Sequence, residues 1–248
     1  MTEPIEVGFN YLDQIQGKLT ELKNSIQSLQ PAVNALTETI SQGGLIYVFG
    51  TGHAHMMAEE MFYRAGGLAN VYPILIPELM LHQNASMSTK LERDPNQIGN
   101  ILKNYELNEK DILILVSNSG GNPLITTLSK KVQERGLKVI AITSLKHSRS
   151  ATSKTANNEK LADIADYVID NQGEVGDALI SFTELESNAG PTSTVLGATI
   201  INLLSIMVIQ NLLNQGLSPQ VFKSSNTVGG DEWNEEILNN FRKRIKIL

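Results

Sequence analysis

Five short runs of apolar residues lie between residues 45 and 170, and polar positions do not alternate within them. The runs span residues 45–49, 71–77, 111–117, 138–144 and 166–170. A strand covered on both faces shows this continuous apolar pattern, whereas a half-exposed strand alternates. Segments with helical spacing separate several of the runs. The pattern therefore predicts the α/β class, with a doubly wound, mainly parallel, five-stranded sheet.

Apolar residues at helical spacing also occupy both ends of the chain. Residues 8–30 repeat leucine or isoleucine every three or four positions, Pro31 begins or kinks a second helix, and Gly43-Gly44 ends it. These signals predict two N-terminal helices. Further helices are predicted at residues 53–65, 123–135, 194–214 and 231–245, and a short edge strand at residues 178–182.

No repeat, linker or low-complexity segment divides the sequence, so we expect one domain over residues 1–248. Its parts are N-terminal helices (1–43), an α/β core (44–215) and a helical C-terminal segment (216–248). The N-terminal helices precede the first strand and lie outside any βαβ unit. We expect them to pack against a partner subunit.

Residues 195–213 are apolar and long enough to span a bilayer. The same segment carries two asparagines, a glutamine, a threonine and a serine, and no other segment resembles a span. This composition favours a helix buried among other elements. The N-terminus lacks a basic region followed by an apolar one, so we expect neither a signal peptide nor a membrane partner.

Composition narrows the class of protein. The chain has 248 residues, 41% of them hydrophobic and 19% charged, as in an ordinary globular protein. The formal net charge of −6 argues against a nucleic-acid partner, which would need a basic face. Cysteine is absent, which excludes a disulfide scaffold, a thiolate nucleophile and a cysteine-based zinc site. We expect a cytoplasmic protein.

Polar loops follow the predicted strands. Residues 50–53 (Gly-Thr-Gly-His) follow the first strand, residues 117–122 (Ser-Asn-Ser-Gly-Gly-Asn) follow the third, and Thr143-Ser144 end the fourth, while residues 191–194 (Pro-Thr-Ser-Thr) precede the long late helix. Ligands of open parallel sheets bind at the carboxyl ends of the strands. Hydroxyls, close backbone N–H groups and helix N-termini suit a small oxyanion such as phosphate. Helix capping explains any one such loop, but three at one edge favour an oxyanion site.

Other motifs fit less well. The first loop is not a dinucleotide GxGxxG motif, and the loop at residues 117–122 lacks the GK[ST] of a nucleoside triphosphate site. His53 and His55 lie two residues apart, on different sides of a helix, and no third ligand follows, so we expect no metal and no cofactor. Glu60 and Arg64 have the spacing of a helix ion pair.

With these residues assembled, the chain resembles the SIS (sugar isomerase) domain family, whose flavodoxin-like folds bind phosphosugars. "DILILVSNSGGNP", "KVIAITS", "NAGPTSTVLGATIINLL" and "LIYVFGTGHAHMMAEEMFYRAGG" match its motifs over residues 40–215. The match is closest to a bacterial group of phosphosugar-binding proteins, which share the first loop and a terminal "GGDE-N" segment, here at Gly229 to Asn234. Hexulose-phosphate and arabinose-phosphate isomerases are more distant, and carry Gly-x-Gly-Arg/Lys-Ser-Gly where this chain has Gly50-Thr51-Gly52-His53-Ala54-His55.

The resemblance implies that Ser117 and Ser119 bind phosphate, with help from residues of the neighbouring loops, in a homodimer or tetramer. The predicted substrate-binding residues are Gly50, Thr51, Gly52, His55, Ser117, Asn118, Ser119, Gly120, Asn122, Thr143, Ser144, Ser193 and Thr194. His147 is expected to be a loop residue near the phosphate.

Aldose–ketose isomerisation needs a base that moves a proton between C1 and C2, and a group that handles the oxygen protons. We assign Glu60 as the base, with His82 or His53 acting on the oxygens. His82 resembles a histidine that follows the second strand in arabinose-phosphate isomerases. Two alternatives stay open: a non-catalytic phosphosugar sensor, and a lyase that cleaves an ether of an amino-sugar phosphate. The sequence does not decide whether Asp231 and Glu232 reach a site or only cap the last helix.

Overall fold

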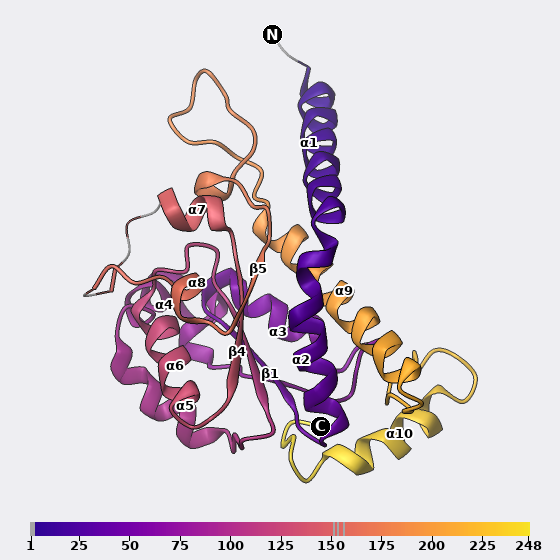
Figure 1. Ribbon diagram of the computed structural model, residues 1–248. Helices are drawn as coiled ribbons and strands as arrows, with labels where there is room; N and C mark the ends of the chain where they lie inside the picture. Colours follow the sequence, from indigo (N-terminus) through magenta and orange to yellow (C-terminus); the bar gives the residue numbers. More distant parts are fainter. Residues whose placement is uncertain (1–2, 151, 153, 156) are drawn as a thin grey trace.

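The computed structural model describes residues 3–150, 152, 154–155 and 157–248, and it contains a five-stranded parallel sheet between two layers of helices (Figure 1). The strands are β1 (Ile46–Gly50), β2 (Val71–Pro73), β3 (Ile112–Val116), β4 (Lys138–Thr143) and β5 (Tyr167–Asp170). Their order is β2-β1-β3-β4-β5, and every pairing is parallel. This is the flavodoxin-like order, with its switch point between β1 and β3. The predicted fold class is confirmed.

Helices account for most of the remaining described chain. They are α1 (Pro4–Asn24), α2 (Gln30–Ser41), α3 (Met56–Met61), α4 (Leu81–Leu91), α5 (Ile98–Asn104), α6 (Pro123–Gln133), α7 (Leu145–Ser150), α8 (Leu161–Ile164), α9 (Ser193–Asn214) and α10 (Gly230–Phe241). Sequence periodicity does not predict α4, α5, α7 and α8. In α4 the backbone of Asn84 is not helical (φ −161°), and the resulting kink interrupts the apolar spacing.

The two faces of the sheet bury separate clusters of apolar side chains. Ile46, Val48 and Ile114 point to the face that α2, α3 and α9 cover. Tyr47, Phe49 and Leu115 point to the opposite face, which packs against α5, α6 and α8. Because both faces are covered, the strands need no polar alternation, which explains the continuous runs in the sequence.

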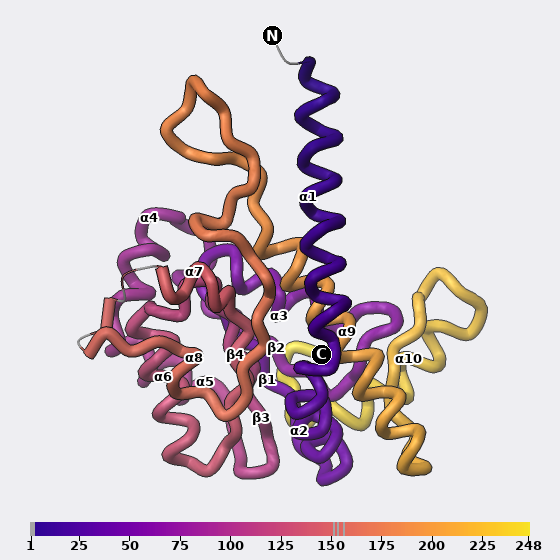
Figure 2. Tube along the Cα trace, turned by 45° about the horizontal axis from the view of Figure 1, so that its top comes forward, coloured from indigo at the N-terminus to yellow at the C-terminus, as the bar shows by residue number. Residues whose placement is uncertain are grey.

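The two N-terminal helices differ in environment, contrary to the expectation that both form a peripheral arm. The side chains of Val33 and Leu36 in α2 are fully buried in the main cluster. The N-terminal half of α1 extends beyond the body of the protein (Figures 1 and 2) and exposes Ile5 and Phe9. Only this half has the character of an arm.

The first helix after β1 is shorter than predicted. A 3₁₀ turn (Gly52–His55) leads into α3, which ends at Met61 instead of residue 65. Tyr63 then adopts a left-handed backbone (φ 44°), and the chain pairs with the C-terminal segment through an antiparallel bridge between Leu68 and Val221. These tertiary contacts replace the last helical turn.

Residues 178–182 are not an edge strand of the sheet, and that prediction is wrong. Ile180 forms only an isolated antiparallel bridge with Ala189, inside a loop that leaves β5 and returns to α9. The segment therefore pairs with its own loop. Figure 1 shows this loop projecting from the carboxyl edge of the sheet beside α1.

Helix α9 is the one helix in the described residues that is long and apolar enough to cross a membrane. Its inner face packs against α2 and α3, with Ile200 and Leu204 fully buried. Packing among other elements agrees with the prediction. The opposite face leaves Ile206 and Leu213 exposed by more than half.

The C-terminal segment closes the second face of the sheet. Helix α10 ends at Phe241, four residues before the predicted end. Arg244 then donates two hydrogen bonds to the buried carboxylate of Asp111 (2.9 and 2.8 Å), and Ile245 is fully buried. Asp231 and Glu232 lie exposed in the first turn of α10, where they complement the helix dipole.

Candidate functional site

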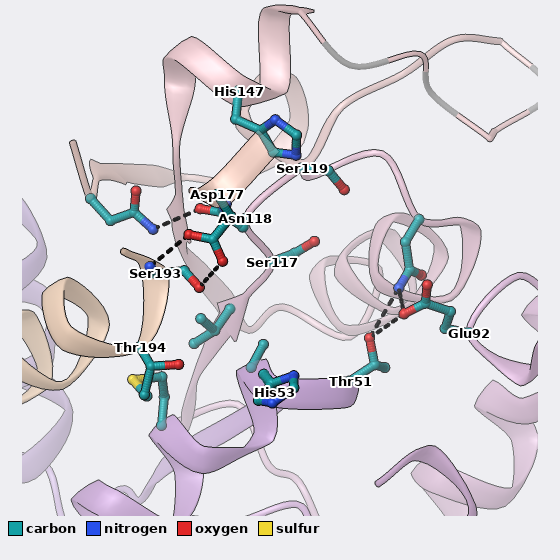
Figure 3. Close-up of a pocket in the computed structure, with 15 residues that line it drawn as sticks. Thr51, His53, Glu92, Ser117, Asn118, Ser119, His147, Asp177, Ser193 and Thr194 are labelled. Carbon is teal, nitrogen blue, oxygen red and sulfur yellow. Dashed lines mark hydrogen bonds between the residues drawn. The ribbon is translucent and has the colours of Figure 1, made fainter. Parts of the chain in front are cut away.

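A pocket of about 280 Å³ opens at the carboxyl ends of β1 and β3, the switch point of the sheet (Figure 3). Its walls come from the loops after β1, β3 and β5, from α3 and α7, from the end of α4 and from the start of α9. The lining residues are Thr51, His53, Ala54, Met57, Glu92, Val116, Ser117, Asn118, Ser119, Asn122, His147, Asn171, Asp177, Ser193 and Thr194. Eight of the residues assigned from the sequence as binding or catalytic line it.

Glycine is required in the loop after β1. A Cβ added to Gly50 would lie 2.6 Å from the backbone of Ala54, and Gly52 has a left-handed backbone (φ 56°). This tight turn brings Thr51 and His53 to the pocket. His55 turns back, since its Nδ1 contacts the carbonyl of Gly52 and its Nε2 lies 3.5 Å from Glu59. The two glycines therefore shape the loop, and His55 stabilises it.

The loop after β3 presents hydrogen-bond donors that have no acceptor. Ser117 Oγ accepts a bond from the backbone N–H of Gly120 (3.2 Å), but neither Ser117 Oγ nor Ser119 Oγ donates a bond to any residue that the structure describes. Asn118 Nδ2 is the one buried side-chain nitrogen or oxygen without a partner in the described chain. An uncompensated buried donor is costly. These three donors can bind an oxyanion at the N-terminal end of α6.

Thr143 and Ser144 lie beneath this loop and do not line the pocket. Both are fully buried. Thr143 Oγ1 donates to the carbonyl of Asn118 (3.1 Å), and Ser144 Oγ donates to the carbonyl of Gly173 (2.6 Å). Gly120, with φ 60°, packs against the Thr143 hydroxyl. The structure thus gives these residues a supporting position under the predicted phosphate loop.

The N-terminus of α9 is occupied by a carboxylate of the protein itself. Asp177 Oδ1 accepts from the backbone N–H groups of Thr192 (3.0 Å) and Ser193 (2.7 Å) and from the Thr192 hydroxyl (2.8 Å). Asp177 Oδ2 accepts from the Ser193 hydroxyl (2.6 Å). The helix dipole favours a negative charge here. The Ser193 hydroxyl is therefore already engaged, whereas Thr194 lines the pocket.

Glu92 forms a polar cluster on the other side of the pocket. Its Oε2 accepts from Thr51 Oγ1 (2.7 Å) and Asn122 Nδ2 (3.1 Å). Asn122 also caps α6 by accepting from Ile125 N–H (3.1 Å). Glu92 Oε1 has no hydrogen-bond partner among the described residues. Figure 3 shows Glu92 and Asp177 on opposite sides of the pocket, with Ser117 and His53 between them.

His147 lies at the pocket near Ser119, but in helix α7 and not in a loop as the sequence analysis expects. Its Nδ1 accepts a bond from the backbone N–H of Gly176 (3.1 Å), so this nitrogen carries no proton. Burial holds the pKa of His147 below its usual value, although the nearby Asp177 carboxylate opposes the shift. The neutral histidine thus connects α7 to the loop that carries Asp177.

Glu60 and His82 do not line the pocket. Glu60 pairs with Arg64 on α3 and accepts from Asn202 Nδ2 of α9 (2.8 Å), so the predicted helix ion pair is present. His82 is exposed near the start of α4. Their catalytic roles stay predictions.

Sequence reasoning misses Glu92, Asn171 and Asp177 as pocket residues. Asn171 directly follows β5 and donates to Asn118 Oδ1 (3.1 Å), so the rule that places other residues after strands applies to it as well. Glu92 lies in a stretch without a predicted element, and Asp177 lies seven residues beyond β5. No local pattern marks either carboxylate.

The pocket is acidic. Glu92 and Asp177 line it, and no lysine or arginine is among the lining residues. Over the parts of the chain that the structure describes, no group of three histidine, aspartate or glutamate side chains is arranged to hold a metal ion. The arrangement offers an anion subsite of neutral donors, an unpaired carboxylate oxygen and two histidines.

The chain matches the family model described as "SIS domain" over residues 10–144. Bacterial relatives with the family name UPF0309 match along nearly the whole chain. A UPF0309 protein of Halalkalibacterium halodurans is 37% identical over 97% of this chain and 95% of its own length. One from Caldanaerobacter subterraneus is 38% identical, over 96% and 98% respectively.

Solved structures share the fold at lower identity. A phosphoheptose isomerase from Francisella tularensis aligns with a TM-score of 0.56 and 14% identity, over 84% of this chain and all of that one (100%). The E. coli CFT073 protein c3406, solved in complex with a sugar phosphate, aligns with a TM-score of 0.53 and 14% identity, over 87% of this chain and 94% of that one. The family model spans more than half of the chain, and relatives above 30% identity span almost all of it; the chain therefore belongs to the SIS domain family, within the UPF0309 group of bacterial proteins.

Proposed function

We propose that this protein binds a phosphorylated sugar at the switch-point pocket and interconverts its aldose and ketose forms. The observation that carries the proposal is the loop after β3, where Ser117 Oγ, Ser119 Oγ and Asn118 Nδ2 are donors without acceptors in the described chain. They lie in the loop that leads into α6, whose dipole favours a negative charge near its start. The structural relatives include a phosphoheptose isomerase and a protein in complex with a sugar phosphate, which agrees with this ligand class.

The absence of lysine and arginine from the lining affects how the phosphate binds. Neutral hydroxyl, amide and backbone donors would carry the contacts, with support from the helix dipole. With the phosphate on the loop after β3, the sugar would extend between Glu92, His53 and Thr194. This orientation leaves the sugar carbons near groups that can transfer protons.

Glu92 is the carboxylate that the geometry best supports as the base. Its Oε2 is held by Thr51 and Asn122, and its Oε1 is free for a substrate proton. In the proposed step Glu92 removes the C2 proton of the aldose and an enediol forms. Glu92 then returns the proton to C1, while His53 moves a proton from O2 to O1, so that atoms and charge balance. Glu60 would act instead only after release from Arg64 and Asn202.

Isotope exchange tests the reaction. Arabinose 5-phosphate, fructose 6-phosphate and glucosamine 6-phosphate are incubated in deuterium oxide, and NMR follows incorporation at C1 and C2. We expect exchange with at least one sugar, and a loss of about 10²–10⁴-fold in Glu92→Gln, as for removal of a general base. Glu60→Gln is the matched control and should exchange within about twofold of the wild type. The reverse pattern would assign the base to Glu60.

The same panel separates the alternative functions. A sensor would be stabilised by a sugar phosphate in thermal unfolding, because ligand that binds only the folded state raises stability, but would give no exchange. A lyase would release an acid from an ether of an amino-sugar phosphate and leave the aldoses unchanged. If no phosphorylated sugar stabilises the protein, the phosphate subsite itself is wrong.

We further propose that the protein is a homo-oligomer in the cytoplasm. Ile5, Phe9 and Leu12 form a stripe on α1 whose side chains are 65%, 59% and 62% exposed, which is unfavourable in an isolated subunit. The apolar outer face of α9 adds Ile206 and Leu213. A second copy covering these faces would bury them. Light scattering at several concentrations tests this, with Phe9→Asp expected to shift the protein toward the monomer.

A further inference from the structure

The loop between β5 and α9 forms one wall of the pocket, yet it is fixed from outside the sheet. It begins at Asn171, carries Asp177 to the N-terminus of α9, and ends at Pro191. On its outer side it faces the middle of α1, from Tyr11 to Lys18. The Tyr11 hydroxyl donates to the carbonyl of Pro191 (2.9 Å), and the Tyr11 ring leaves no room for a Cβ at Gly190.

A second contact between α1 and the loop is an ion pair. A crevice of about 400 Å³ lies between the two segments, next to Gly17 and Leu179. At its edge Lys18 Nζ lies 2.6 Å from Glu174 Oε1, and the Lys18 side chain is only 12% exposed. The ion pair and the contacts of Tyr11 with Pro191 and Gly190 thus join α1 to the loop.

Glu174 is joined directly to the residues that cap α9. Its backbone N–H donates to Thr192 Oγ1 (3.4 Å), and its carbonyl accepts from the N–H of Asp177 (3.0 Å). Thr192 Oγ1 in turn donates to Asp177 Oδ1 (2.8 Å). A displacement of Glu174 would therefore move Asp177 and the start of α9, which includes Thr194.

Glu174 has a second partner that provides an internal comparison. Lys146 Nζ lies 2.6 Å from Glu174 Oε2, but its side chain is 62% exposed. Together Lys146 and Lys18 lower the pKa of Glu174 to about 2, so the carboxylate is charged at any pH near neutrality. Solvent screens the exposed pair, whereas loss of the Lys18 ammonium would leave the carboxylate without its less exposed partner.

We propose that Lys18 is a positioning residue for the substrate pocket, which holds the β5–α9 loop through Glu174 and thereby fixes Asp177 and Thr194 on the sugar side. The inference rests on the proposed function for its binding readout. It assigns to α1, a helix outside the α/β core, a part in forming the pocket of its own subunit.

Three substitutions of comparable size test the proposal. Lys18→Met removes the ammonium and keeps the apolar stem, Lys18→Arg keeps the charge, and Lys146→Met removes the exposed partner of the same carboxylate. Calorimetry measures the dissociation constants for fructose 6-phosphate and for inorganic phosphate. Hydrogen exchange of residues 174–180 is measured in the ligand-free protein.

We expect Lys18→Met to weaken fructose 6-phosphate binding about tenfold and inorganic phosphate less than twofold, because phosphate contacts only the loop after β3. In turnover, KM should rise while kcat stays within about twofold. Lys18→Arg and Lys146→Met should both stay within about twofold of the wild type. Exchange of residues 174–180 should accelerate in Lys18→Met alone. Glu174→Gln should behave like Lys18→Met and serves as a second variant if that one folds poorly.

Two results would overturn the proposal. One is unchanged fructose 6-phosphate affinity and unchanged exchange in Lys18→Met. The other is an equal loss of affinity for both ligands, which would indicate general destabilisation. If the wild type binds neither ligand, the proposed function fails, and hydrogen exchange alone decides the positioning role. Exchange of residues 174–180 that is no faster in Lys18→Met than in the wild type then refutes that role.

Discussion

Two hydroxyl-rich segments face each other across the pocket, and only one is free to bind an anion. Residues 117–120 lie a few residues before α6, which Asn122 caps, whereas Thr192 to Thr194 begin α9 itself. Asp177 accepts four hydrogen bonds at the start of α9. At the other segment Ser117, Ser119 and Asn118 keep unpaired donors in the described chain. Both segments have hydroxyl groups that could donate hydrogen bonds to an anion. The Asp177 carboxylate occupies those of Thr192 and Ser193 at α9, so the donors of residues 117–120 remain for an anion.

The difference separates the two ends of the proposed ligand. The phosphate would find its donors at residues 117–120, whereas the charge of Asp177 would repel it from α9. The hydroxyl groups of a sugar can approach Asp177 and Thr194 without that repulsion. The four variants below test this distinction.

Removing the free hydroxyls should have the largest effect. We expect Ser117→Ala with Ser119→Ala to weaken sugar-phosphate binding about 100-fold or more, because two hydrogen bonds to a charged group, each about 1.5–3 kcal/mol, are lost. Ser193→Ala is the matched control, and since Asp177 already holds its hydroxyl the loss should stay below about threefold. Calorimetric titration measures both. Equal losses in the two variants would show that α9 also binds the phosphate.

Neutralising the internal carboxylate should act on stability. Asp177→Asn keeps a side chain that tolerates the left-handed backbone (φ 57°) but loses the charge at α9, and we expect a loss of about 1 kcal/mol in the free energy of unfolding. Urea denaturation measures it. Asp13→Asn on the exposed surface of α1 should change stability by less than about 0.5 kcal/mol. An unchanged free energy of unfolding in Asp177→Asn would mean that the charge of this cap contributes nothing to stability.

A loss of stability of similar size is expected from the support beneath the free loop. Thr143→Val removes the bond to the Asn118 carbonyl and should cost about 1 kcal/mol of stability and about threefold in sugar-phosphate affinity. Thr37→Val removes a similar buried bond, to Val33 in α2, far from the pocket. It should reduce stability by a similar amount and leave affinity unchanged. Urea denaturation and calorimetry on both variants compare the two, and an affinity loss in Thr37→Val would contradict a local role for Thr143.

The smallest effect is a pH dependence near the Asp177 loop. Burial lowers the pKa of His147 in the folded protein, so the unfolded chain binds the proton more readily. The stability from neutral His147 is therefore complete above about pH 6.5, the pKa of an unperturbed histidine, and declines as the pH falls below it. Asp177 and Lys160, the charged groups that act on His147, oppose each other. Urea denaturation at pH 7.5 and 5.5 should show a smaller decline in His147→Gln than in the wild type.

Sequence alone predicts the sheet and one side of the pocket. The strands follow from continuous apolar runs, and Ser117, Ser119 and Thr51 follow from their positions after strands, both of which are local properties. The sequence does not predict that the carboxylates of Glu92 and Asp177 lie in the pocket. Glu92 reaches the pocket from the C-terminal end of α4, a helix that the sequence does not predict, and Asp177 from a long loop that returns to α9. Neither path leaves a periodic signal.

The catalytic assignments illustrate the same limit. Glu60 lies in α3 as predicted, but its carboxylate pairs with Arg64 and accepts from Asn202 of α9, and it does not line the pocket. The assignment of His82 depends on a loop after β2, but the residue lies at the start of a helix that the sequence does not predict. Whether a polar side chain reaches the pocket depends on where its helix ends and turns, and tertiary contacts decide this.

The contact between Arg244 and Asp111 also affects folding of the chain during its synthesis on the ribosome. Asp111 accepts from the N–H of Leu45 at the entry to β1, directly precedes β3, and depends on a guanidinium encoded 133 positions later. Ile245 completes the apolar layer on the same face of the sheet. During synthesis one face of the central strands therefore stays incompletely covered until residues 244 and 245 have left the ribosome. Until then nascent chains of this protein are candidates for chaperone protection.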